Sequence, residues 1–228
     1  FTRYLEVLAN AYLVFQISQD PLLVGINAGL RLLPLFLLGW VIGIISDRLD
    51  KRLMVILSLM IFFLVSLSLF FLVYFEIIEI WHLMIGSLFS GIGWAFELPT
   101  RRSLIGDFLN SENVSLGIGI DASTQNFTRI IGPLMAGVLL VLLPSLPYLM
   151  TSISHFLGIF LALLILRNQY SKFIRKIEKS SIFDDLKYLL KGKVFRLVLG
   201  ITVIMNIWAF PYQSMVPVIA ETVLKINP

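Results

Sequence analysis

Long apolar runs dominate the sequence, and each is long enough to cross a lipid bilayer as a helix. A crossing helix needs about 20 apolar residues, since each residue advances it by about 1.5 Å. In lipid, only helices and closed barrels satisfy the backbone, and barrel strands would alternate polar and apolar residues where these runs are continuous. We therefore predict an all-α membrane protein. The runs cover roughly residues 1–18, 22–46, 53–75, 80–99, 114–143, 148–167 and 194–216.

Composition supports lipid as the main solvent of this chain. Hydrophobic residues make up 58% of it and charged residues 14%, whereas a soluble domain is about half apolar and a quarter charged. The sequence has no cysteine, and its two histidines, His82 and His155, are too isolated for a metal centre. We predict no cofactor, no metal site and no nucleic-acid partner.

Lysines and arginines gather in alternate joints between the runs, at residues 48–52, 101–102 and 167–196. The positive-inside rule makes these joints cytoplasmic, so the first run crosses from inside to outside and the seventh ends outside. Phe1 lies within an apolar run, which leads us to expect a cut end. A signal peptide is the rival interpretation, but no basic leader or small-residue cleavage site is visible.

This pattern predicts a bundle followed by a linker and one more crossing. Residues 1–167 form a six-helix transmembrane bundle with a truncated first helix. Residues 168–193 form a cytoplasmic amphipathic linker whose basic face rests on anionic lipid. Residues 194–228 form a seventh transmembrane helix and the start of an external loop, after which we expect a missing C-terminal bundle.

One internal repeat links the second and fifth runs. The segment 31–34 (Arg-Leu-Leu-Pro) recurs imperfectly as 129–133 (Arg-Ile-Ile-Gly-Pro), in runs that cross the membrane in opposite directions. This pattern is typical of two inverted three-helix repeats. Small residues and prolines there permit close helix approach and bending, although tight static packing explains them as well. The residues assigned to these bends and contacts are Arg31, Pro34, Gly132, Pro133 and Gly137.

The first run carries Arg3, Glu6 and Asn10 on one face, at i, i+3 and i+7 spacing. A charge at mid-bilayer costs at least about 2.5 kcal/mol, so a carboxylate there needs a reason. Two interpretations stay open: Glu6 carries a coupling proton, or Arg3 neutralises it as a static pair.

A polar stripe runs along the fifth apolar run from Asp121 to Arg129. It cannot face lipid, and it fits a cavity or moving interface better than a static seam, since two opposite charges there have no partner nearby in sequence. Asp121 is the second candidate for proton coupling. Trp94, on the face of the fourth run with Ser87, Ser90 and Glu97, is suited to stacking on an aromatic or cationic solute or to core packing. The candidate substrate-cavity residues are Asn10, Trp94, Glu97, Gln125, Arg129, Asn206 and Gln213.

The joint after the second run reads Gly43-Ile-Ile-Ser-Asp47-Arg48-Leu-Asp50-Lys51-Arg52. It resembles the signature loop of the major facilitator superfamily, and Asp50, where most members have glycine, is similar to the drug and siderophore efflux branch (enterobactin-exporter-like and macrolide-efflux-like). The resemblance implies twelve helices in two bundles, with runs one, four and seven around a central cavity and runs two and five at a rocking interface. It also implies that Asp47 caps a helix of the second bundle. The candidate signature-loop residues are Gly43, Asp47, Arg48, Asp50, Lys51 and Arg52.

These features together predict a secondary active transporter of the prokaryotic inner membrane. The leading hypothesis is proton-coupled efflux of small amphiphilic compounds by alternating access, with a small-molecule substrate, protons, the bilayer and the missing bundle as partners. An importer of the same superfamily remains open. A seven-helix receptor is less favoured, and a retinal protein would need a buried lysine that the seventh run lacks. A membrane enzyme ranks last, because metal-ligand clusters and nucleophile motifs are absent from the sequence.

The predicted topology can be tested by single cysteines at Ser18 and Leu49 in an otherwise cysteine-free full-length protein. An impermeant thiol reagent added to intact cells should label position 18, at the predicted outer end of the first run, and leave position 49 unlabelled. Labelling of position 49 from outside would overturn the assignment of the basic joints to the cytoplasm.

Overall fold

The computed structural model describes residues 1–48, 50–110, 112–169, 192, 196–197, 200–201, 204, 212–223 and 225. For residues 38–41, 43–48, 52, 165–169, 212–214 and 221 it describes the backbone alone. The chain forms two compact units, one of Phe1–Phe173 with Ser214–Pro228 and one of Ile174–Gln213. Most of the predicted linker and of the seventh run lies outside the described residues, and so does Asn206.

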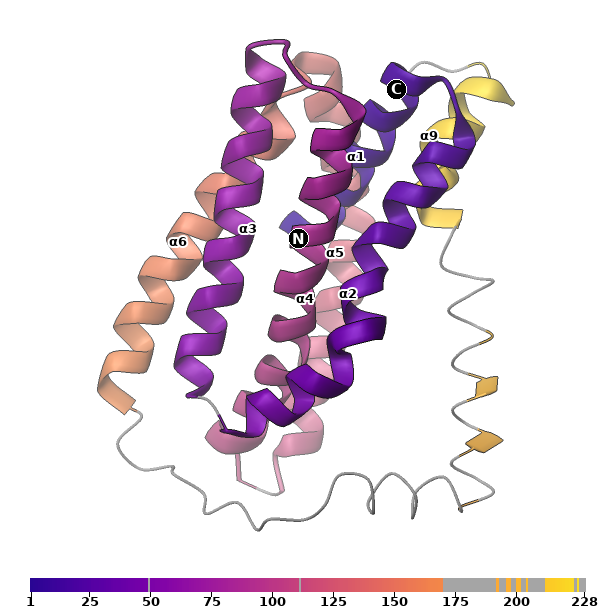
Figure 1. Cartoon of the computed structure of the whole chain (residues 1–228). Helices are drawn as coiled ribbons and strands as arrows, with labels where there is room; N and C mark the ends of the chain where they lie inside the picture. The colour runs from indigo at the N-terminus through magenta and orange to yellow at the C-terminus, as the bar shows by residue number, and fades with distance from the viewer. Residues whose placement is uncertain are drawn as a thin grey trace. The chain divides into compact units, whose positions relative to one another are not determined.

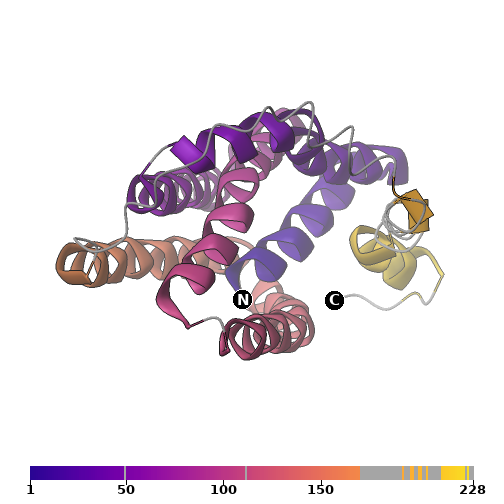
Figure 2. The same ribbon diagram turned by 90° about the horizontal axis from the view of Figure 1, so that it is seen from below.

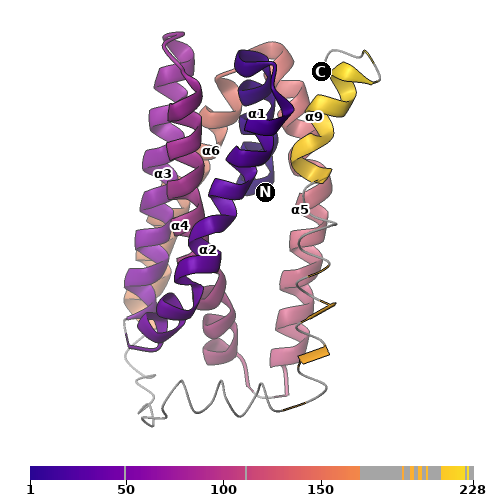
Figure 3. The same cartoon turned by 45° about the vertical axis from the view of Figure 1, so that its right-hand side comes forward.

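The described parts of the chain are helical and contain no β-strand, as predicted. Figures 1 and 3 show helices α1 to α6 running alongside one another within the first unit. In the view from below, the N-terminal end lies among these helices (Figure 2). The helices are α1 (Thr2–Ser18), α2 (Pro21–Arg48), α3 (Lys51–Tyr74), α4 (Ile80–Phe108), α5 (Val114–Leu142), α6 (Leu146–Gln169) and α9 (Tyr212–Thr222).

Apolar side chains cover the outer faces of several helices. Along α5, Ile130, Leu134, Val138 and Val141 are each at least 60% exposed, at spacings that place them on one side of the helix. Such a continuous apolar surface suits lipid rather than water. Within the described residues, the segments long and apolar enough to cross a membrane are Leu53–Tyr74, Val114–Leu142 and Leu146–Leu164.

The helix ends differ from the predicted ones at two places. α4 was expected to end near Pro99 but continues to Phe108, with the proline inside the helix. The extra turns carry Arg101, which bonds both to Glu97 one turn earlier and to Asp121 of α5, so polar contacts outside the apolar run sustain the helix. α9 likewise extends past residue 216, where the external loop was predicted to begin.

The core lies where the helices pack in pairs. α2 packs most extensively against α4, α3 against both α4 and α6, and α1 against α5. One cluster of buried apolar residues includes Val14 of α1, Val24 of α2, Leu83 of α4 and Tyr148 of α6. The same cluster includes Val218 of α9, which ties the C-terminal helix of the unit to the bundle.

Gly91 sets how closely α2 and α4 approach each other. A Cβ atom at this position would lie 2.2 Å from the carbonyl oxygen of Arg31 and 3.0 Å from Cδ of Pro34. The first distance is far shorter than any real contact, and its partner is backbone, which cannot rotate away as a side chain can. α2 and α4 therefore meet at a point that only glycine allows.

Gly91→Ala should destabilise the full-length protein, because the added methyl group must push α2 away from α4. Overpacking of this kind costs about 1–3 kcal/mol. Thermal unfolding in detergent measures the effect. Gly106→Ala is the matched control on the same helix, since nothing lies within 4 Å of the Cβ that it adds. Equal stability of the two variants would contradict the close approach.

Candidate functional site

A buried ion pair joins three helices at the centre of the site. Nη1 of Arg31, from α2, donates to Oε1 of Glu6, from α1, at 3.2 Å. The Ser90 hydroxyl, from α4, donates to the same carboxylate oxygen at 2.8 Å. Glu6 is 1% exposed and Arg31 is 7% exposed. Arg3, which the sequence offered as a static partner of Glu6, does not pair with it, because α2, the next helix along the chain, supplies the guanidinium instead.

Local packing explains why these side chains meet. Ser90 directly precedes Gly91, whose missing side chain lets the backbone at Arg31 lie against α4. Gly91, which brings α2 and α4 together, is thus the neighbour in sequence of Ser90, which donates to Glu6. A side chain at position 91 would separate the Arg31 guanidinium from the Glu6 carboxylate.

Arg3 lies over aromatic rings rather than beside a carboxylate. Its guanidinium carbon is 3.7 Å from the ring centre of Trp94 on α4 and 5.1 Å from that of Tyr4. Such cation–π contacts are worth about 0.5–2 kcal/mol, more when the pair is desolvated. Trp94, predicted to stack on a solute, thus carries a cation of the protein itself.

A second set of ionic contacts connects α4 with α5. Arg101 bonds to Glu97 at 3.0 Å, one turn away on α4, and lies 3.3 Å from Asp121 on α5. The amide of Gln125 donates to the other oxygen of Asp121 at 2.8 Å. Asp121 therefore has a cationic partner on the neighbouring helix, which its surroundings in sequence do not reveal.

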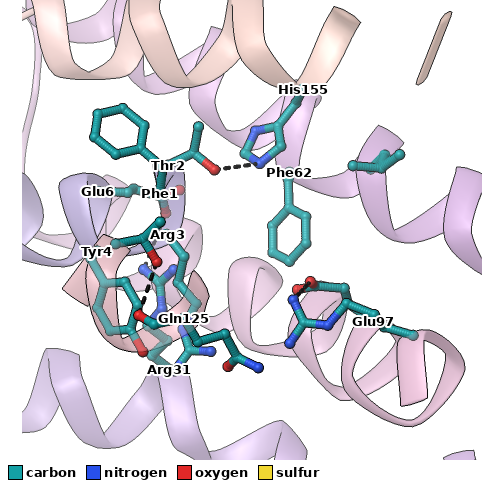
Figure 4. A pocket seen from close by; sticks show the side chains of 13 residues that line it. Phe1, Thr2, Arg3, Tyr4, Glu6, Arg31, Phe62, Glu97, Gln125 and His155 are labelled. Carbon is teal, nitrogen blue, oxygen red and sulfur yellow. Dashed lines mark hydrogen bonds and ion pairs between the residues drawn. The ribbon is translucent and has the colours of Figure 1, made fainter. Parts of the chain in front are cut away.

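A cavity of about 180 Å³ lies beside these groups (Figure 4). In this view the side chains of Arg3, Tyr4, Arg31 and Gln125 gather in one part of the lining. Glu6, Glu97 and Arg101 also contribute to it, so both ionic systems reach the same space. The cavity is lined by Phe1, Thr2, Arg3, Tyr4, Glu6, Arg31, Leu59, Phe62, Glu97, Arg101, Gln125, Thr128 and His155.

His155 of α6, which the sequence showed only as too isolated for a metal centre, belongs to this lining. Nε2 of His155 lies 3.2 Å from the Thr2 hydroxyl, and its ring stacks on Phe62 with centroids 5.1 Å apart. Nδ1 is buried without a hydrogen bond. Thr2 and Phe62 carry no sequence signal of their own, since single hydroxyl and aromatic residues are common in membrane helices.

Asn10 does not line this cavity. Its amide donates to the Ser87 hydroxyl at 3.3 Å, and its carbonyl oxygen accepts from the Tyr148 hydroxyl at 2.6 Å. All three groups are buried. In this structure Asn10 therefore links α1, α4 and α6 within the core. Arg129 is also outside the lining and lies 5.8 Å from the ring centre of Tyr4.

The predicted glycine contacts of α5 divide into one close approach and one open position. A Cβ at Gly132 would lie 2.7 Å from Cβ of Tyr4, so α5 and α1 touch there, next to Pro133. A Cβ at Gly137 would meet nothing within 4 Å. Five residues turn a helix by about 140° beyond one full turn, so Gly137 lies away from the face that carries Gly132. Among the described residues nothing contacts this position, so the predicted helix contact at Gly137 stays a prediction.

The signature loop is only partly described. Lys51, at the start of α3, forms an ion pair with Asp107 in the last turn of α4. This pair ties the loop to the extension of α4 beyond Pro99. The structure does not describe the side chains of four other loop residues, Gly43, Asp47, Arg48 and Arg52. The side chain of Gln213, a candidate substrate-cavity residue, is likewise outside the described part of the chain. Among the described residues, no group of three potential ligands is placed to hold a metal ion.

Comparison with known proteins finds a family of membrane proteins, which agrees with the polar interior and apolar exterior of the bundle. A model for the family of transmembrane secretion effectors, which are major facilitator superfamily proteins, matches residues 1–228. The chain belongs to this family. The resemblance to the superfamily is thereby confirmed, and the family is one of multi-pass membrane transport proteins, not of enzymes.

A relative with an assigned role is the staphyloferrin A transporter of Staphylococcus aureus (strain NCTC 8325 / PS 47). It is 26% identical to this chain over 221 residues. The match covers 93% of the chain and 54% of the relative. This family member therefore spans about half the length of the curated relative that it matches.

The ion pair between Glu6 and Arg31 can be measured by a double-mutant cycle in the full-length protein. Arg31→Gln should cost about 3–5 kcal/mol, because it leaves a buried carboxylate without its cation. The double variant Glu6→Gln with Arg31→Gln should recover a large part of that loss, since no buried charge remains. Unfolding free energies from denaturing-detergent titrations measure both.

Arg102→Gln is the control for this cycle, because Arg102 is an exposed arginine of α4. It should change stability by about 0.5 kcal/mol or less. Additive effects of the two single substitutions at Glu6 and Arg31 would show that the pair is not coupled.

Proposed function

We propose that the full-length protein is a proton-coupled secondary transporter that exports small amphiphilic compounds, of the drug or siderophore type, by alternating access in a prokaryotic inner membrane. The observation that carries the proposal is the Glu6 carboxylate, which is buried at a cavity and bound by groups from two other helices. Import by the same machinery is the second candidate. The name of the S. aureus relative supports a siderophore as one kind of substrate.

Glu6 is suited to couple proton movement to helix movement. While ionised, it attracts Arg31 and accepts the Ser90 hydrogen bond, which holds α1 against α2 and α4. Protonation removes the negative charge, so the attraction to Arg31 falls and a buried guanidinium is left without its counter-ion. A rearrangement of the helices that gives this guanidinium a new partner or water then lowers the free energy. Protonation of a carboxylate in this position therefore changes how the helices pack.

The two close helix contacts support the proposed inverted repeats of three helices, α1–α3 and α4–α6. α2 meets α4 at Gly91, beside Arg31 and Pro34, and α5 meets α1 at Gly132, beside Pro133. If the repeats are equivalent, these contacts join corresponding pairs of helices, α2 with α4 and α5 with α1. Both lie next to the cavity, where a transporter of repeated design is expected to move.

Glu6→Gln should abolish transport driven by a pH gradient and retain substrate binding, because the neutral amide has the size of the protonated carboxyl but cannot release a proton. Asp121→Asn should be milder, since the amide oxygen can still accept from Gln125 and Arg101 keeps its ion pair with Glu97. Transport by proteoliposomes of the full-length protein under an imposed pH gradient measures both effects.

Glu112→Gln is the control for this experiment, because it neutralises an exposed carboxylate and should transport normally. Normal gradient-driven transport by the Glu6→Gln variant would refute the coupling role of Glu6.

A further inference from the structure

The charges that line the cavity do not balance. Three arginines and two glutamates contribute to the lining. Glu6 is paired with Arg31, and Glu97 is paired with Arg101. Among the described residues, no carboxylate lies within ion-pair distance of Arg3. The lining side chains therefore carry a net charge of +1 (two glutamates against three arginines). Arg101 also pairs with Asp121, which lies outside the lining, so Arg3 is the lining arginine for which the described residues supply no ion-pair partner.

Arg3 is held in place by rings and not by an anion. Its guanidinium lies 3.7 Å from the ring centre of Trp94, which fixes the plane of the group while leaving its N–H edges free to donate. It also lies within electrostatic range of two like charges, Arg31 and Arg101, and of one carboxylate, Glu97. A half-buried cation beside like charges is unfavourable unless an anion binds there. Arg31 adds a buried Nη2 that makes no hydrogen bond.

We propose that the cavity binds the carboxylate of a small organic anion, with Arg3 as its anchor. A guanidinium fork matches the two oxygens of a carboxylate, which makes this pairing strong and directional. The net charge of +1 suits a single negative charge better than a dianionic phosphate monoester. A cationic solute would find both lining glutamates already neutralised by arginines.

The remaining lining fits an apolar or aromatic body attached to that carboxylate. Tyr4, Leu59 and Phe62 present apolar surface to a cavity of about 180 Å³, which has room for a single ring of the substrate. This inference deepens the proposed transport function, and rests on it, by assigning the substrate a charge. A binding measurement without any gradient tests it separately from coupling.

Binding of radiolabelled benzoate, benzylammonium and phenyl phosphate to the purified full-length protein at neutral pH provides the test. Benzoate and benzylammonium have similar size and opposite charge, and phenyl phosphate distinguishes a carboxylate site from a phosphate site. Equilibrium dialysis should show benzoate binding more tightly than either of the others. Arg3→Gln should weaken benzoate binding about tenfold or more, the loss expected for a charge-assisted pair, and leave benzylammonium binding unchanged.

Two further variants guard against simple loss of folding. Arg102→Gln removes an exposed arginine of α4 and should leave benzoate binding intact. Glu97→Gln removes a carboxylate within electrostatic range of Arg3 and leaves Asp121 as the ion-pair partner of Arg101, so it should tighten benzoate binding.

Several results would overturn the anion site. They are benzoate binding no tighter than that of benzylammonium, tighter binding of phenyl phosphate, and an unchanged benzoate affinity in Arg3→Gln. Benzoate binding in the expected pattern by a protein that shows no gradient-driven transport would support the anion site and refute the proposed coupling. Normal coupling with no preference for benzoate would do the reverse.

Discussion

The desolvation of one carboxylate constrains much of the arrangement of this bundle. Glu6 is 1% exposed, and an ion removed from water costs several kcal/mol unless charged and polar partners surround it. Arg31 and Ser90 supply those partners from two other helices. Gly91, next to Ser90, has no side chain to hold the α2 backbone at Arg31 away from α4, which keeps these two partners close to each other. A backbone contact and an ion pair therefore depend on each other.

The sequence predicted the helices well because lipid imposes a simple rule on composition and length. The bounds of α1, α2, α3, α5 and α6 lie within a few residues of the apolar runs. The shared face of Ser87, Ser90, Trp94 and Glu97 was also predictable, since helical spacing alone determines it. The end of α4 was missed because hydropathy reports where lipid ends, and a helix can continue beyond that point when polar contacts sustain it.

Partners on other helices were not predictable in the same way. Spacing along one helix placed Arg3 near Glu6, whereas the structure pairs Glu6 with Arg31. In the same way Asp121 seemed to lack a cation that Arg101 provides from α4. The spacing of residues within a helix says which side chains share a face, but not which face of a neighbour they meet. Such pairings depend on crossing points like Gly91, where a single glycine gives only a weak signal.

The polar residues of α4 that contact α1 and α5 occupy one stripe along its length. Ser87 bonds to Asn10, Ser90 to the carboxylate of Glu6, Trp94 stacks on Arg3, and Arg101 bonds to Asp121. A helix turns about its axis as one body, and a step of one residue corresponds to about 100°. Any such rotation of α4 would simultaneously break its contacts with the amide of Asn10, the carboxylate of Glu6, the guanidinium of Arg3 and the carboxylate of Asp121. These contacts consequently cannot be lost one by one through rotation, so α4 must keep them all or give them all up together.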